Sequence, residues 1–180
     1  MSTSSYQLSR CSEKIVAYIA GFVVCKLKQS IRCEVCLTAL TDVEMKPVHT
    51  LIRQKTKGFL TVPSADVIFL CTITEKYFRR YVSESSDHGD MTLSNVQCHK
   101  LVQTVLKSLV GRNVFSSIDM HMFDHEVSNN HIVLLIKAVI EKYLQVRYFY
   151  AGKKYTMHLK ANIKSRSRQV MNKLVLFSGQ

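Results

Sequence analysis

The stretch His131-Ile-Val-Leu-Leu-Ile-Lys-Ala-Val-Ile-Glu-Lys-Tyr-Leu144 is the longest apolar segment with helical spacing in this chain. Its large apolar residues recur three and four positions apart, which is the pattern of one buried helix face: Ile132, Leu135, Ile136, Val139, Ile140, Tyr143 and Leu144. Asn129 or Asn130 can cap its start, and we predict a helix from 131 to about 151. Ala151-Gly152 should interrupt or bend this helix, and a last helix should follow over about 165–177.

Upstream of this stretch, the same periodicity predicts helices over about 13–29, 64–82 and 94–110, with a shorter helical segment over 49–55. Serine supplies the cap of the first long helix, at Ser12. Residues 31–40 are predicted to form a knuckle that restarts a short helix, and 59–64 to be extended. We expect loops over the polar segments 83–92 and 112–130.

The segment 13–29 is expected to be a core helix that other elements approach closely. Its apolar residues with helical spacing are Ile15, Ile19, Phe22 and Val23. Ala17 and Gly21 lie four positions apart, so they share one face of the helix. Because both side chains are small or absent, a neighbouring element could pack very close to the backbone there.

Composition supports a helical fold. The chain has 180 residues, of which 47% are hydrophobic, and it contains only 6 Gly and 2 Pro. These counts exclude wholesale disorder and disfavour a turn-rich β architecture. We therefore predict an all-α fold, an irregular bundle of about five helices with a zinc knuckle. Residues 1–11 are predicted to be a disordered tail, and residues 12–180 a single helical domain.

The N-terminal segment and the cysteines point to a reducing compartment. Residues 1–10 are polar and show no secretory signal. The apolar run 15–25 is too short to span a bilayer, so no membrane contact is expected. The six cysteines are therefore expected to be reduced thiols.

Cys33 and Cys36 form a CxxC pair, which is half of a tetrahedral zinc site. Far downstream, His121 and His125 have the H-x3-H spacing of a second half, and His131 is a third candidate at the start of the long helix. This pattern predicts a structural Zn²⁺ that ties the N-terminal third of the chain to the C-terminal third. Cys33, Cys36 and His131 are the stronger candidates, and His121 and His125 compete for the last position.

Positive charge is concentrated near the C-terminus. The formal charge is +12, and after Glu126 ten basic residues accompany one carboxylate, that of Glu141. Such a field attracts polyanions, above all nucleic acid. The residues expected to contact DNA phosphates without base specificity are Arg147, Lys153, Lys154, Lys160, Lys164, Arg166 and Arg168. The competing interpretation is a solvated basic surface that contacts no polyanion.

Catalytic motifs are missing from the sequence. It has neither a phosphate-binding glycine loop nor a G-x-S-x-G elbow, so we do not expect an enzyme. The alternative is a metal-dependent nuclease that uses Asp119, Asp124 and Glu126, in which a divalent ion would activate water.

Several segments together resemble the C-terminal region of transposases of the P-element type, including their THAP-domain relatives. The segments are Tyr18-Ile-Ala-Gly-Phe-Val-Val-Cys25-Lys-Leu, Cys33-Glu-Val-Cys36, Gly58-Phe-Leu-Thr-Val-Pro-Ser64, His131-Ile-Val-Leu-Leu-Ile-Lys137, Glu141-Lys-Tyr143-Leu-Gln-Val-Arg147 and Lys173-Leu-Val-Leu-Phe177. They cover about residues 14–180 in the order and spacing of that region. The resemblance favours His121 and His131 over His125 as metal ligands.

The resemblance also limits what this chain is expected to do. Complete transposases of this kind carry a zinc-binding DNA-recognition domain, an RNase H-like core with two aspartates and a glutamate, and an inserted GTP-binding domain. This chain has room for none of them, so the resemblance does not imply catalysis. It implies a nuclear, transposon-derived protein that contacts the DNA backbone or assembles with other transposase domains or chains. The remaining alternative is an inactive remnant that only contacts other proteins.

Overall fold

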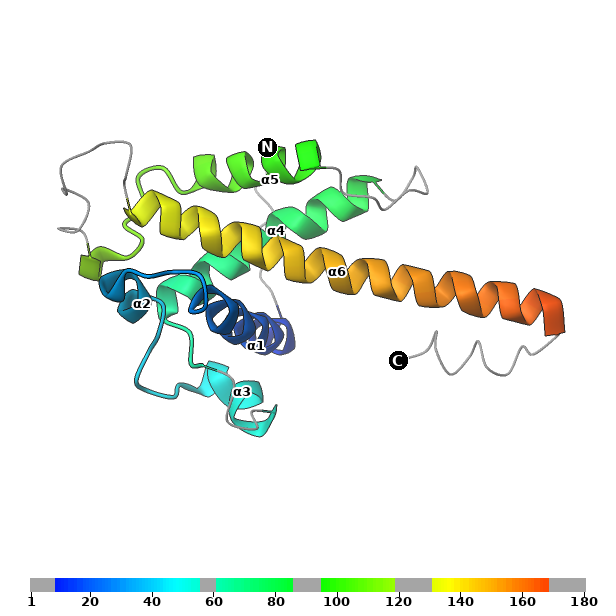
Figure 1. Ribbon diagram of the computed structural model, residues 1–180, viewed down its shortest axis with the longest axis horizontal. Coiled ribbons are helices and arrows are strands. Elements are labelled where there is room, and N and C mark those ends of the chain that lie inside the picture. Colours follow the sequence, from blue (N-terminus) through cyan, green and yellow to red (C-terminus); the bar gives the residue numbers. More distant parts are fainter. Residues whose placement is uncertain (1–8, 56–60, 86–94, 119–130, 169–180) are drawn as a thin grey trace. The chain divides into compact units, whose positions relative to one another are not determined.

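The computed structural model describes residues 9–55, 61–85, 95–118 and 131–168, and confirms the all-α prediction over these ranges (Figure 1). The elements, in chain order, are α1 Arg10–Leu27, α2 Glu34–Ala39, the 3-10 helix η1 Pro47–His49, α3 Thr50–Lys55, α4 Ala65–Ser85, α5 Asn95–Ser108 and α6 His131–Arg168. By their internal contacts, residues up to Leu144 form one unit and residues from Gln145 form another, and α6 runs through both.

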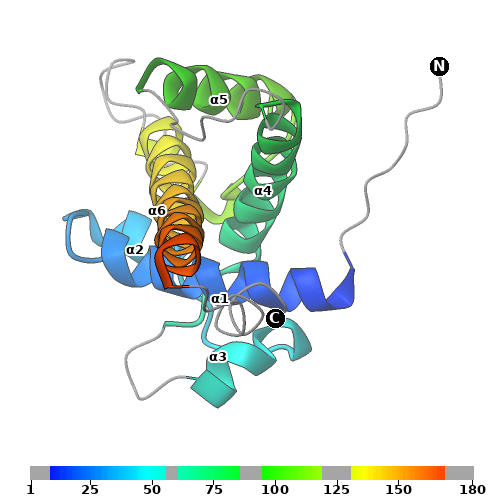
Figure 2. The ribbon, with the colours of Figure 1, turned by 90° about the vertical axis from the view of Figure 1, so that its right-hand side faces the viewer.

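Within the first unit, α1 packs against η1, α3 and α4, and α4 also packs against α5. Figure 2 shows α5 beside one end of α4 and α1 at its other end, and both helices pack against it. The largest fully buried side chains come from α3, α4, α6 and the segments between helices: Leu40, Ile52, Leu70, Phe115, Ile140, Tyr143 and Leu144. The core predicted for the start of α6 is therefore present, and among its apolar positions only Ile136 is half-buried.

The segment after α2 and the segment before α4 pair briefly. Thr41 and Pro63 form an isolated antiparallel bridge, with Asp42 donating its backbone N–H to Val62 and Ser64 donating its own to Leu40. This extended pairing agrees with the expectation for 59–64 over the part that is described. Apart from this bridge, the four described ranges contain no strand pairing. None of their helices combines the length and apolar character needed to cross a lipid bilayer.

Helix α1 begins earlier than the sequence predicted. Its N-cap is Ser9, whose side chain accepts a hydrogen bond from the backbone N–H of Ser12 at 3.3 Å, so Ser12 lies within the helix and does not cap it. The buried face is also rotated from the expected one, because Ile15 is 45% exposed while Val16 and Ala20 are buried. Small residues on the inner face let neighbouring elements approach, which periodicity of large residues alone did not indicate.

Helix α6 continues through Ala151-Gly152 to Arg168, so the predicted interruption is wrong. A glycine inside a helix costs only about 1 kcal/mol relative to alanine, and most neighbouring residues are good helix formers. The separate helix expected over 165–177 does not begin at 165, because residues 165–168 still belong to α6. The rest of that segment lies outside the described residues.

Gly21 is the position where α1 meets its neighbours most closely. A Cβ atom built there would lie 2.9 Å from the backbone oxygen of Thr61 and 3.1 Å from Cδ1 of Ile52. Ile52 is itself fully buried. The close approach expected from the Ala17 and Gly21 spacing is therefore present, and it is made by α3 and by the segment that precedes α4.

Gly21→Ala should destabilise the fold. Alanine improves helix propensity by about 1 kcal/mol, but overpacking against a backbone oxygen costs about 1–3 kcal/mol. We expect the free energy of unfolding, measured by urea denaturation, to fall by about 1 kcal/mol net. Ile52→Val removes Cδ1, one of the two atoms that the new Cβ would meet. Its destabilisation should therefore be smaller in the Gly21→Ala background than in the parent chain. A stabilised Gly21→Ala variant would contradict the close contact.

Candidate metal centre

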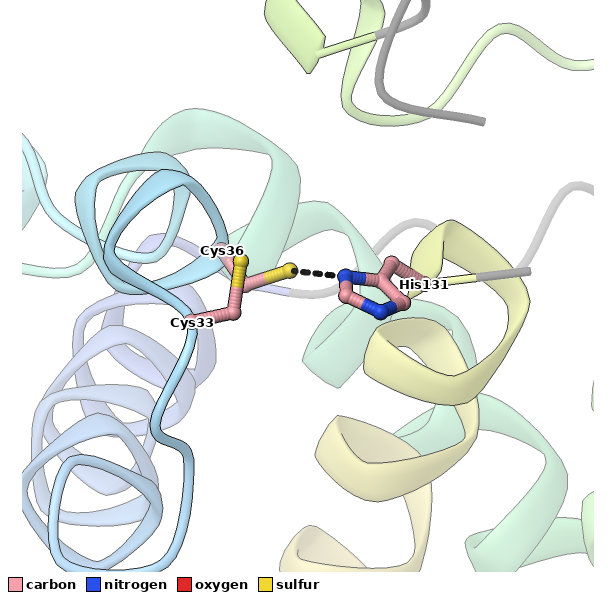
Figure 3. Close-up of side chains that lie close together, drawn as sticks. All are labelled: Cys33, Cys36 and His131. Atoms are coloured by element: carbon pink, nitrogen blue, oxygen red, sulfur yellow. Dashed lines mark hydrogen bonds between the residues drawn. The ribbon is translucent and has the colours of Figure 1, made fainter. Parts of the chain in front are cut away.

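The start of α2 positions the two cysteines of the CxxC pair. Cys33 is the N-cap of α2, with extended backbone angles, and Cys36 lies in the first turn of the same helix. The carbonyl of Cys33 accepts the backbone N–H of Leu37 at 3.0 Å, which fixes the start of the helix. In this geometry both thiols lie on one side of the helix start (Figure 3). Cys36 is buried, and Cys33 is half-buried.

His131, the first residue of α6, lies opposite the two thiols. The Cys36 Sγ atom is 3.9 Å from Nδ1 of His131, although the two residues are 95 positions apart in the chain (Figure 3). One ligand atom from each of Cys33, Cys36 and His131 lies within 4.8 Å of the others. The structure therefore brings together three of the four residues predicted to bind metal.

These distances fit a tetrahedral metal site closely. With zinc–sulfur bonds of about 2.3 Å and zinc–nitrogen bonds of about 2.0 Å, ligand atoms in a tetrahedron lie about 3.5–3.8 Å apart. The three side chains would need to move by about 1 Å or less to meet this geometry. Two thiols and one imidazole are also the ligand types that zinc prefers over hard cations. The group can thus hold a metal ion.

Burial, and next the neighbouring Cys33, raise the pKa of the Cys36 thiol to about 11. Cys36 is therefore a neutral thiol in the metal-free chain at neutral pH. A bound cation must displace its proton, so metal binding here releases protons. A raised pKa also opposes use of Cys36 as a nucleophile, since the thiolate is the reactive form.

The surroundings of the cluster are mainly apolar. A cavity of about 250 Å³ is lined by the three candidate ligands together with Ile31, Arg32, Leu134, Leu135 and Ala138. An apolar surround limits water access to a metal and strengthens its electrostatic interactions. Within the ranges that the structure describes, no other group of three or more His, Cys, Asp or Glu side chains converges in this way.

The remaining candidate residues of the site lie where the structure gives no description. His121 and His125 are outside the described ranges, and so are Asp119, Asp124 and Glu126 of the nuclease alternative. All six cysteines lie inside the ranges and are free thiols. Of the four that were not expected to bind metal, the buried Cys71 and the half-buried Cys98 have a raised pKa, mainly because removal from water disfavours the thiolate.

The predicted DNA-contacting residues all belong to α6. Arg147 is half-buried, and Lys153, Lys154, Lys160, Lys164, Arg166 and Arg168 follow along the same helix. Beyond Phe149 only the helical backbone is described. The structure therefore places these residues on one continuous helix, whereas the predicted helices, 131–151 and 165–177, left Lys153, Lys154 and Lys160 between them.

Glu75 is a buried carboxylate that was not among the residues predicted from the sequence. Glu75 on α4 is 2% exposed, accepts a hydrogen bond from the Tyr143 hydroxyl at 2.9 Å, and pairs with Nε of Arg79 at 2.8 Å. Tyr143 lies on α6, so this contact joins α4 to α6 within the first unit. The signal was present in the sequence, because position 75 shares the inner face of α4 with 67, 71 and 78.

His49 is a buried histidine with one unpaired nitrogen. It is 1% exposed, and its Nδ1 accepts the backbone N–H of Lys46 at 3.0 Å. The proton must therefore sit on Nε2, which has no hydrogen-bond partner among the described residues. Burial lowers the pKa of His49, Asp42 opposes the change, and Lys46 adds to it.

The lowered pKa of His49 should make stability depend on pH. The unfolded chain takes up a proton near pH 6.5 while folded His49 stays neutral, so stability is full above that pH and falls as pH drops. The slope from this one group is at most about 1.4 kcal/mol per pH unit. His49→Asn keeps an acceptor for Lys46 but cannot titrate. Urea denaturation from pH 7.5 to 5 should give a flatter curve for the variant, and parallel curves would contradict this account.

A protein family and one human protein match this chain in sequence. Residues 7–153 match the model of the family described as the C-terminal domain of DNA transposase THAP9. The human DNA transposase THAP9 is 30% identical over 155 residues, which is 82% of this chain and 16% of that protein. No solved structure matches this chain. The chain thus corresponds to about one sixth of the length of the human relative.

Proposed function

The chain belongs to the family of the C-terminal domain of DNA transposase THAP9. On this basis we propose that it is a helical module, stabilised by a bound zinc ion, that contacts the DNA backbone in the nucleus. The resemblance identified from sequence is confirmed at the level of this family. Its role in DNA contact, or in assembly with other transposase domains or chains, is the proposal. The observation that carries it is the charge of α6, which from Gln145 to Arg168 has seven basic residues and no carboxylate.

The spacing of these residues supports contact with one continuous phosphate row. At 100° per residue, six of the seven positions, namely 147, 153, 154, 160, 164 and 168, fall within an arc of about 140°. Position 166 falls outside the arc. Over a length of about 30 Å, this arrangement suits phosphates along a groove edge, and it offers no fixed donor pattern to base edges. We therefore propose binding with little sequence preference.

Zinc is the metal that we propose for the cluster of Cys33, Cys36 and His131. Its part in the module would be to hold the start of α2 against the start of α6, which carries the cations further along. The fourth ligand that we propose is His121, as the family resemblance implies, and His125 is its competitor. Zinc in such a closed site has no open position for water, so its contribution would be to folding and not to chemistry.

We propose no enzymatic activity for this chain on its own. The alternative, a nuclease built on Asp119, Asp124 and Glu126, makes a distinct prediction. Two duplexes of unrelated sequence should bind with affinities within about threefold of each other, as expected for backbone contacts. With magnesium or manganese present, gel electrophoresis should show both duplexes intact. Cleavage that disappears in the Asp124→Ala variant would support the nuclease and refute the proposal.

A further inference from the structure

Helices α4 and α5 meet along a seam that is lined by polar and aromatic side chains. Tyr77, Arg80 and Tyr81 are spaced i, i+3, i+4 on α4, and Gln97, Lys100, Leu101 and Thr104 are spaced i, i+3, i+4, i+7 on α5. Spacing of this kind normally carries the apolar stripe with which two helices pack. Here only Leu101 is both apolar and buried.

The two stripes enclose a hollow of about 410 Å³. This volume lies within the range typical of small-molecule sites. Leu101 forms its buried part, while Arg80, Lys100 and Thr104 are exposed and the two tyrosines are half-buried. The Thr104 hydroxyl donates to the Lys100 carbonyl at 2.9 Å, which holds it against its own helix.

The lining combines three kinds of group that recognise a nucleotide. The rings of Tyr77 and Tyr81 offer faces or edges on which a base can stack. Arg80 and Lys100 supply positive charge for a phosphate, and Gln97 supplies an amide that can donate and accept hydrogen bonds. None of the described lining residues is acidic, so the hollow favours an anionic ligand with an aromatic part.

We propose that this hollow between α4 and α5 binds an unpaired nucleotide of a single nucleic-acid strand. The base stacks against Tyr81 or Tyr77, and the adjoining phosphate lies between Arg80 and Lys100. A base inside a duplex is covered by its neighbours and cannot reach the hollow, so the site selects single strands or frayed ends. This hollow and the basic part of α6 would both bind nucleic acid, but they share no residue, because every lining residue of the hollow precedes Leu144.

The test measures binding of the full chain to fluorescent oligothymidylate by anisotropy, with a mixed-sequence duplex as the second probe. Tyr81→Leu should weaken single-strand binding about tenfold, since one stacked base is lost, and Tyr81→Phe should retain it. The duplex affinity should stay within about twofold in both. Circular dichroism and thermal unfolding establish that each variant is folded.

Charge removal gives a second readout that does not alter the core. Replacing Arg80 and Lys100 with alanine should flatten the salt dependence of single-strand binding by about 0.7 logarithmic units, because one neutralised phosphate is lost. Lys76→Ala with Lys107→Ala removes the same charge from exposed positions of the same two helices outside the hollow. This matched control should leave the slope for single strands nearly unchanged.

Several outcomes would overturn the proposal. One is an equal flattening of the salt dependence in the Arg80/Lys100 variant and in the Lys76/Lys107 control. Another is an unchanged single-strand affinity in Tyr81→Leu, and a third is an equal loss of affinity for the duplex in Tyr81→Leu. Free thymidine monophosphate should compete only at a concentration at least about a hundredfold higher than the strand. Equal competition would make a free nucleotide the ligand and refute strand binding. Repeating the measurements with Lys164, Arg166 and Arg168 replaced by alanine separates failure here from failure of the proposed function.

Discussion

Cys36→Ser should release the metal and lower stability more than any other single substitution considered for this chain. Cys36 is buried, and its Sγ lies 3.9 Å from Nδ1 of His131 in the candidate metal-binding group. Loss of a thiolate ligand should weaken zinc binding by at least about a hundredfold. At a fixed excess of zinc, this lowers the free energy of unfolding by about 2.7 kcal/mol. Urea denaturation with and without zinc measures the difference.

Cys71→Ser is the matched control for the metal effect. Cys71 is also a buried thiol, on α4, and it is not part of the metal-binding group. Its substitution should cost the same free energy with and without zinc. The cost of Cys36→Ser should shrink when zinc is removed with a chelator, because the lost interaction is then absent from the parent chain as well. A zinc-independent cost for Cys36→Ser would argue against metal binding.

Replacing Lys164, Arg166 and Arg168 with alanine should weaken duplex binding by a similar factor on all sequences. Each phosphate contact contributes about 0.9 units to the slope of the logarithm of affinity against the logarithm of salt concentration. Lys164 and Arg168 lie within the arc proposed to face the phosphates and Arg166 lies outside it, so two lost contacts should flatten the slope by about 1.8 units. Anisotropy titrations on two unrelated duplexes over a range of salt concentrations measure both effects.

A control for net charge makes the result specific to α6. Lys14, Lys28 and Lys55 are exposed lysines outside α6, and their triple alanine variant has the same net charge as the α6 variant. It should leave the slope nearly unchanged. If instead the α6 variant retains the parent affinity at low salt, these charges do not contact DNA. They would then serve to solvate the surface or to pair with acidic parts of a complete transposase.

Local periodicity was enough to predict most helices and the inner face of α6. Its predictions were wrong where tertiary contacts or neighbouring residues outweigh local signals. Ala151-Gly152 was expected to break a helix, yet one glycine costs too little to stop α6. In α1, the position of Ile15 suggested burial, but small residues mark the face that other elements approach, as Gly21 shows.

The residues of the candidate metal-binding group were predictable by type, but their geometry was not. A CxxC pair requires further ligands, which made the downstream histidines candidates. Only the fold shows that His131 comes to within hydrogen-bonding distance of Cys36 from 95 positions away. For Glu75, helical spacing places position 75 on the inner face of α4, but only the fold supplies the partners, Tyr143 and Arg79, that make burial of its carboxylate favourable.

The most direct test of the central claim is zinc K-edge X-ray absorption on the purified chain, combined with metal analysis. The account predicts about one zinc per chain, with two sulfur ligands at about 2.3 Å and two nitrogen ligands at about 2.0 Å. If His121 is the fourth ligand, His121→Ala should remove one nitrogen from the metal shell. If His125 is the fourth ligand, His125→Ala should do so instead. A chain without zinc, a disulfide between Cys33 and Cys36, or a metal shell without sulfur would contradict the account.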